Sequence, residues 1–140
     1  NMGTFIAEKT ISKIVTQGIN PIDAKIAIMG LAFKENCPDF RNTKVLTIIE
    51  RLSNYNCEIS VTDSWVLGQD VKSQLDINLI SLEEIFEKDA VIIAVGHQEY
   101  CNFNLLDWKK MLKPNGVIID VKSLYHSKMF NNTSFLHWSL

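Results

Sequence analysis

The sequence is poor in cysteine, and its cysteines form no pattern. Cys37, Cys57 and Cys101 lie far apart, and no pair has the CxxC spacing of a zinc site. Their small and odd number also argues against the disulfide framework of a small secreted domain. We therefore expect each thiol to be buried or incidental, no metal site, and a reducing cytoplasm as the compartment.

Long hydrophobic runs and an excess of positive charge are missing as well. The longest apolar runs, such as 90–96 and 117–119, are far shorter than the roughly 20 residues that a membrane-spanning helix needs. The 14 basic residues are outnumbered by 16 acidic ones, the net charge is −2, and no cluster of Lys and Arg suits a phosphate backbone. We expect neither a membrane nor a nucleic acid as a partner.

What remains is the composition of one folded domain. Of the 140 residues, 46% are hydrophobic and 21% are charged, which argues against a disordered tail and a fibrous protein. A chain of this length can bury a single core. Because it begins with Asn1 instead of Met, inside a helical pattern with no cap before it, we expect a fragment of a longer protein.

Hydrophobic periodicity predicts alternating helices and strands. The expected helices cover residues 2–15, 45–52, 68–75, 82–87 and 105–112. The expected strands cover residues 25–30, 57–62, 78–80, 90–95 and 117–120, with a last apolar segment at 135–138. This alternation predicts an α/β fold, namely a Rossmann-like, doubly wound and mainly parallel sheet in which 25–30 is the first, central strand.

Local signals place the ends of several of these elements. Gly18 suits the left-handed end of the first helix. Ser81 and Glu84 form a capping-box pattern for the fourth helix, and residues 114–116 (Pro-Asn-Gly) predict a turn before the next strand.

In an open α/β sheet, ligands bind beyond the carboxyl ends of the strands. Four predicted loops lie there, at 31–42, 63–68, 96–104 and 121–125. The first is long and carries Lys34 and Arg41, a point charge and a planar fork that can hold phosphate oxygens. The alternative is a solvated loop whose cations form surface ion pairs with Glu35 and Asp39.

The first loop lacks the GxGxxG pattern of a dinucleotide site. Only Gly30 is present, and bulky Leu31 and Phe33 follow it, so we do not expect the main NAD site here. Asp63 stands where a dinucleotide fold has its ribose-binding acid. Without the glycines we interpret Asp63 as a turn-forming residue.

Other polar residues follow the later strands. His97 stands where a general base could lie, but His126 and His137 are distant in sequence, and we interpret His97 as a polar turn residue near a ligand. Lys122 is expected to point toward the same crevice, the alternative being an ordinary surface lysine. No nucleophilic site can be assembled from these residues, so we predict no catalytic residue.

Residues 30–43, GLAFKENCPDFRNT, resemble the GLAFKxxxxDxRNS/T signature of the UDP-glucose/GDP-mannose dehydrogenase family, at the start of its carboxy-terminal UDP-binding domain. The resemblance continues through residues 61–63, 94–97, 120–122 and 138–140, with Ser64 in place of the family's usual Pro. Within the family these residues are most similar to those of UDP-N-acetylhexosamine (UDP-GlcNAc or UDP-GalNAc) 6-dehydrogenases of surface polysaccharide synthesis. Essentially the whole chain is covered.

The resemblance implies an activity for the full-length enzyme. Members of the family oxidise the C6 alcohol of a nucleotide sugar to a carboxylate in two NAD-dependent steps, through a cysteine thiohemiacetal and thioester. The family's GxCxxKD-type nucleophile motif and its amino-terminal GxGxxG are absent from these residues. The fragment alone is therefore expected to bind substrate without turning it over, while other domains carry most of the NAD site.

The resemblance also implies roles for single residues. Phe33 and Lys34 match positions that contact the nucleotide sugar, and Arg41 matches one that reaches NAD bound to the amino-terminal domain. Lys122 stands in the place of a substrate-binding Arg and lacks its bidentate fork. Residues 1–20 would be the end of a helix that connects the domains, and 24–140 the UDP-binding domain. The implied partners are a UDP-sugar, the amino-terminal and central domains of the same enzyme, and further copies in a homodimer or higher oligomer.

Three other readings stay open at this point. The chain could belong to a GDP-mannose or UDP-glucose 6-dehydrogenase of the same family. A stand-alone nucleotide-sensing or oligomerisation module would predict an initiator Met and a capped first helix, and Asn1 is expected to provide neither. An α/β interaction domain would predict no nucleotide binding and indifference to changes at Lys34.

Overall fold

The computed structural model describes all residues from 1 to 140 and contains five strands. The strands are β1 (Lys25–Met29), β2 (Glu58–Thr62), β3 (Lys88–Ile93), β4 (Leu112–Asp120) and β5 (Leu136–Ser139). The helices are α1 (Met2–Thr16), α2 (Thr43–Asn54), α3 (Gly68–Leu75) and α4 (Leu105–Met111), with 3-10 turns at Leu82–Glu84, Gln98–Tyr100 and Ser127–Phe130. The strands form one parallel sheet in the order β2-β1-β3-β4-β5. The predicted doubly wound α/β fold is confirmed.

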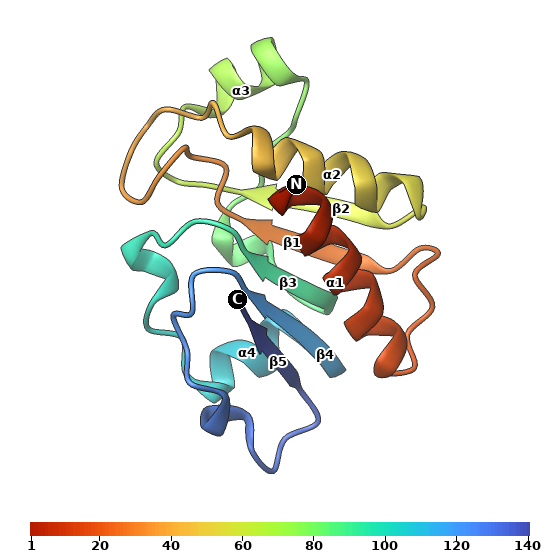
Figure 1. Cartoon of the computed structure of the whole chain (residues 1–140). Helices are drawn as coiled ribbons and strands as arrows, with labels where there is room; N and C mark the ends of the chain where they lie inside the picture. The colour runs from red at the N-terminus through yellow and green to blue at the C-terminus, as the bar shows by residue number, and fades with distance from the viewer.

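Helices lie on both faces of the sheet (Figure 1). α1 and α2 cover one face and α4 the other, so the inner strands are buried on both sides, as their continuous apolar runs predicted. Successive side chains of a strand point to opposite faces. Ile92 of β3 therefore lies in the core under α1 and α2, while Val91 and Ile93 lie in the core under α4.

The first helix belongs to the same core as the sheet. Its side chains Ile6, Ala7 and Ile14 are fully buried in the cluster that α2 and the strands share. Our expectation that this helix begins without a cap was wrong, because the Asn1 side chain accepts a hydrogen bond from the backbone N–H of Thr4 at 2.9 Å. The division of the chain into 1–20 and 24–140 remains a prediction.

Two predicted elements differ in the structure. β1 is not the central strand, because β3 occupies the middle of the five and β1 lies between β2 and β3. The capping box at Ser81 and Glu84 forms, yet its helix is a single 3-10 turn that ends at Glu84. The next residue, Ile85, is extended and almost fully buried in the core under α4, so tertiary packing ends the helix early.

The remaining differences concern strand ends. Residues 78–80 contribute only an isolated bridge between Leu79 and Val61. The predicted turn at residues 114–116 lies inside β4, where Asn115 has a left-handed φ of 66° and the register with β3 shifts. Gly18 has a φ of 78° just after α1, as predicted. None of the helices combines the length and the apolar character that crossing a membrane requires.

Candidate functional site

The strand order reverses between β1 and β3, and the loops that follow these two strands separate at this point. Gly30, directly after β1, has a φ of 106°, and a Cβ atom there would lie 2.6 Å from the Cβ of Val95. The backbone N–H of Ala94 donates to the carbonyl of Met29 at 2.9 Å, so the two strand ends touch. Only glycine fits at residue 30, and the crevice of a doubly wound sheet opens beyond it.

Asp63 joins the ends of β1 and β2. Its carboxylate is buried, and one oxygen accepts the backbone N–H groups of Leu31 at 2.7 Å and Ala32 at 2.8 Å. The other oxygen accepts the N–H of Trp65 at 2.8 Å, which confirms the interpretation of Asp63 as a turn-forming residue. The carboxylate is therefore used within the chain and is not free for a ribose.

The contacts of Asp63 also determine whether the turn after β1 can bind NAD. A dinucleotide pyrophosphate binds to free backbone N–H groups in the first turn after β1. Here Leu31 and Ala32 donate theirs to Asp63, and both side chains are fully buried. The residues of this turn do not fit the cofactor, which agrees with the missing glycines.

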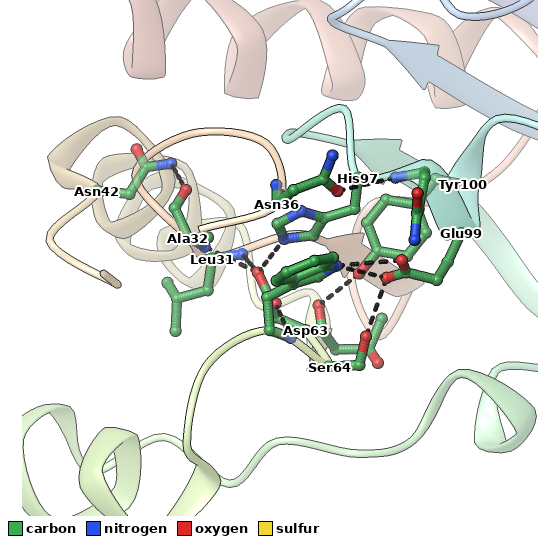
Figure 2. A network of polar contacts seen from close by, with 12 residues as sticks. Leu31, Ala32, Asn36, Asn42, Asp63, Ser64, His97, Glu99 and Tyr100 are labelled. Carbon is green, nitrogen blue, oxygen red and sulfur yellow. Dashed lines mark hydrogen bonds and ion pairs between the residues drawn. The ribbon is translucent and has the colours of Figure 1, made fainter. Parts of the chain in front are cut away.

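His97 continues this network from the loop after β3 (Figure 2). Its Nε2 lies 2.9 Å from Asp63 Oδ2, and its Nδ1 accepts the backbone N–H of Asn36 at 2.8 Å. A ring nitrogen that accepts carries no proton, so His97 is the neutral tautomer whose Nε2–H donates to Asp63. The ring is fully buried, packs between the loops and faces no solvent, while its place near a ligand stays a prediction.

A second set of side chains surrounds the imidazole. Trp65 stacks on His97 with ring centroids 5.8 Å apart, and Tyr100 packs at 5.5 Å. Glu99 accepts hydrogen bonds from Trp65 Nε1 at 2.9 Å and from Ser64 Oγ at 3.0 Å. Burial and the nearby carboxylates raise the pKa of Tyr100 well above its usual value. Ser64, Glu99 and Tyr100 also border a cavity of about 330 Å³ at the end of β2.

Phe33 and Lys34 lie on the outside of this network. Phe33 is 63% exposed, and Lys34 is exposed next to it in the chain and belongs to no ion pair. The backbone around them is held: Asn42 Nδ2 donates to the carbonyl of Ala32 at 2.8 Å, and the N–H of Phe33 donates to the backbone carbonyl of Asp39 at 2.6 Å. The structure thus presents an exposed ring and an exposed ammonium group on neighbouring residues of a held loop.

Arg41 forms the kind of surface ion pair that the alternative interpretation of this loop predicted. Its guanidinium pairs with Asp39 at 2.6 Å, and 86% of its side chain is exposed. Hydrogen bonds from Arg41 lower the pKa of Asp39 to about 2. The two cations of the loop therefore differ, because Arg41 has a local partner and Lys34 has none.

A second Asp–His pair lies at the end of β4. The buried Asp120 accepts the backbone N–H groups of Leu124 at 2.9 Å and Tyr125 at 2.8 Å, and His137 Nε2 lies 2.9 Å from it. On its other side His137 contacts Ser127 Oγ at 2.8 Å. These contacts hold the turn that carries Lys122.

Lys122 is exposed and faces two other parts of the site. Its Cβ is 3.9 Å from where a Cβ of Gly96 would lie, at the start of the His97 loop. Burial, and then the positive charge of Lys122, lower the pKa of Lys44 in the first turn of α2. Our sequence reasoning missed Lys44. The one feature of the sequence that could have pointed to Lys44 is its place in the first turn of a helix, where the helix dipole disfavours positive charge.

The cysteines lie at the margin of this site, where Cys101 Sγ donates to the backbone carbonyl of His97 at 3.4 Å. Cys101 is exposed and Cys37 and Cys57 are half-buried, so of the two roles that we expected, buried or incidental, these thiols fit the incidental one. Burial raises the pKa of the Cys57 thiol, which makes it less reactive. The structure places no three His, Cys, Asp or Glu residues where they could hold a metal ion.

Comparison with known proteins adds relatives to this geometry. Residues 27–127 match the family model described as the UDP-glucose/GDP-mannose dehydrogenase family, UDP binding domain. The chain is 34% identical to UDP-N-acetyl-D-glucosamine 6-dehydrogenase of Salmonella typhi over 87% of its own length and 29% of the relative's. It is 36% identical to protein CapL of Staphylococcus aureus over all of its own length and 32% of that protein's. The chain thus spans about a third of the length of these relatives.

Solved structures have the same fold. A UDP-D-ManNAc dehydrogenase from Pyrococcus horikoshii is 26% identical, with a TM-score of 0.77 over 96% of this chain and 30% of that one. An NDP-N-acetyl-D-galactosaminuronic acid dehydrogenase from Methanosarcina mazei superimposes with a TM-score of 0.85 at 22% identity, over 98% of this chain and 28% of that one. At this lower identity the second likeness speaks for the fold alone.

Proposed function

This chain belongs to the UDP-glucose/GDP-mannose dehydrogenase family, and on that basis we propose that it is the nucleotide-sugar-binding domain of an NAD-dependent UDP-sugar 6-dehydrogenase. The complete enzyme would oxidise the C6 hydroxyl of the sugar to a carboxylate for surface polysaccharide synthesis. The observation that carries the proposal is the exposed pair Phe33 and Lys34, on a held loop at the topological switch point and without an ion-pair partner for Lys34.

Three residues of this chain would bind the substrate. The Lys34 ammonium and the Phe33 ring would contact the nucleotide sugar from one loop, and Lys122 would approach from the turn after β4. Two ammonium groups near one anion favour a diphosphate, because each can form charge-assisted hydrogen bonds with its oxygens. These residues would act by orienting the substrate, since we assign the nucleophile to other domains of the enzyme.

The names of the relatives support a choice of substrate class. The names of several refer to UDP-N-acetyl sugars, including the Salmonella typhi protein and a Pseudomonas aeruginosa protein that is 34% identical over 88% of this chain. We therefore infer a UDP-N-acetylhexosamine as the substrate. A GDP-mannose or UDP-glucose 6-dehydrogenase is the alternative within the family, and a stand-alone nucleotide-binding or oligomerisation module the alternative outside it.

The cofactor would be held by other parts of the enzyme. NAD, when bound, accepts hydride from the sugar, and the turn after β1 in this chain does not fit it. Arg41 would reach across to that cofactor from the edge of the loop, exchanging its contact with Asp39 for one with a phosphate. The amino-terminal and central domains would supply the nucleophile, and residues 1–20 would lead from them to the binding domain at 24–140. We infer a homodimer or higher oligomer in the cytoplasm.

Calorimetric titration of the chain with UDP, GDP and NAD tests this proposal. Binding of UDP with little response to GDP and NAD is the expected outcome, and it would favour the UDP branch of the family. Preference for GDP would favour the GDP-mannose alternative. Silence toward all three nucleotides would contradict the assignment of the binding site to these loops.

A further inference from the structure

Resting on the proposed function, we propose that His97 is a positioning residue for the nucleotide sugar: with its proton fixed by Asp63, it holds the backbone of the loop that presents Phe33 and Lys34. The residue would not touch the substrate, because its ring is fully buried. Its effect would pass through a single hydrogen bond, from the backbone N–H of Asn36 to Nδ1 at 2.8 Å.

The loop needs such a contact on its far side. Before Phe33, the backbone is held at Ala32 by Asp63 and Asn42. After Glu35, the chain turns at Asn36, whose φ of 54° lies in the sparsely populated left-handed region that Asn tolerates better than most residues with a side chain. The His97 bond stabilises this turn, and the Asn36 side chain in turn accepts the N–H of Gln98 at 3.3 Å. Figure 2 shows Asn36 and His97 facing each other across the two loops.

Asp63 makes this contact possible. Its carboxylate takes the proton on Nε2 at 2.9 Å, which leaves Nδ1 as the acceptor that Asn36 requires. The same carboxylate oxygen accepts the N–H groups of Leu31 and Ala32 at the start of the loop. One buried carboxylate therefore fixes both ends of the segment that carries the binding side chains.

A held loop would raise affinity by lowering the entropy that substrate binding must remove. Phe33 and Lys34 are exposed side chains, and ordering mobile backbone and long side chains opposes association. If the backbone from Ala32 to Asn36 is already fixed, only the side chains remain to be ordered. The expected signature is a loss of UDP affinity that accompanies faster hydrogen exchange of the Asn36 amide.

Two substitutions separate the two ring nitrogens. His97→Gln can place an amide N–H near the position of Nε2 and keep the bond to Asp63, but it provides no acceptor for Asn36. His97→Asn can place its Oδ1 near the position of Nδ1 and keep that acceptor, while it loses the donor to Asp63. His126→Gln is the matched control, because His126 Nδ1 also accepts a backbone N–H, that of Lys128 at 3.2 Å, in an exposed turn.

UDP affinity by calorimetry, amide hydrogen exchange of Asn36 by NMR and the thermal midpoint are measured for each variant. We expect His97→Gln to weaken UDP binding about tenfold, which corresponds to the loss of one net hydrogen bond. The same variant should speed hydrogen exchange of the Asn36 amide. In His97→Asn, hydrogen exchange of the Asn36 amide should stay slow and the UDP affinity should stay within about twofold of that of the unaltered chain, because the acceptor for Asn36 is kept and the loop stays ordered. The His126→Gln control should match the unaltered chain in UDP affinity and in Asn36 exchange.

The outcomes separate this inference from the proposed function. An unaltered chain that fails to bind UDP would overturn the proposed function, and with it any role of His97 in binding. A chain that binds UDP equally well with His97→Gln would overturn the positioning role alone. Equal losses in the Gln and Asn variants would overturn it too, since they would trace the effect to packing and not to the Asn36 contact.

Discussion

The imidazole of His137 lies 2.9 Å from the carboxylate of Asp120 at the end of β4, the same separation that joins His97 to Asp63 at the end of β2. Both carboxylates are buried, and each also accepts two backbone N–H groups from a loop that carries a proposed binding residue. The chain thus uses the same device twice at the carboxyl edge of its sheet.

The Asp120 pair leads to a stability prediction. Asp120→Ala would leave the N–H groups of Leu124 and Tyr125 and the ring of His137 without their acceptor, each at least partly buried. Because an unsatisfied buried donor costs about 1 to 3 kcal/mol, we expect a loss of at least about 3 kcal/mol in unfolding free energy. Urea unfolding measures it. The exposed Glu50→Ala should stay within about 0.5 kcal/mol, and a similar result for Asp120 would contradict the role given to these bonds.

Lys34 should determine nucleotide affinity without affecting the fold. Lys34→Ala removes an exposed ammonium that has no ion-pair partner, so we expect unchanged unfolding and a loss of about 1.5 to 3 kcal/mol in UDP binding, the value of a charge-assisted hydrogen bond. Titration calorimetry measures the affinity. Lys109→Ala, an exposed lysine on α4, should bind UDP as the unaltered chain does. Equal affinity in the two variants would remove Lys34 from the site.

Arg41 should affect the cofactor more than the sugar. In the full-length enzyme, Arg41→Ala is expected to raise the KM for NAD by more than the KM for the UDP-sugar, because the Arg41 side chain is 86% exposed and a phosphate of the cofactor could replace Asp39 as its partner. Steady-state kinetics with each substrate varied in turn provides the comparison. Arg51→Ala, an exposed arginine on α2, is the control. Equal increases in both KM values would assign Arg41 to structure or to the sugar instead.

The pair formed by Asp39 and Arg41 predicts a pH dependence. Arg41 lowers the pKa of Asp39 from 3.8 to about 2, so the pair stabilises the folded loop above pH 3.8 and this contribution is lost as the pH falls through about 2. Both side chains lie at the surface, so solvent limits the effect. In the Arg41→Ala variant, the pKa of Asp39 should return toward 3.8 in a carboxyl NMR titration. A titration that the substitution leaves unchanged would show that Arg41 is not the cause.

Short-range patterns in the sequence were sufficient for most of the fold. Apolar periodicity predicted the helices at 2–15 and 45–52 and the main strands, because it reports directly which faces of an element are buried. The strand at the centre of the sheet could not be read in this way. β1 and β3 both contain buried apolar runs, and only the pairing of strands far apart in the chain places β3 in the middle.

The candidate site, like the fold, was predictable from the sequence only in part. The sequence by itself determined that a loop with Phe33, Lys34 and Arg41 follows the first strand and that the glycines of a dinucleotide site are missing. Only the tertiary structure decided that Asp63 and His97 form a buried pair, that Arg41 is taken up by Asp39 while Lys34 is not, and that Lys44 lies near Lys122. Residues 34 positions apart leave no local pattern, because their contact depends on how parallel strands bring their carboxyl ends to one edge.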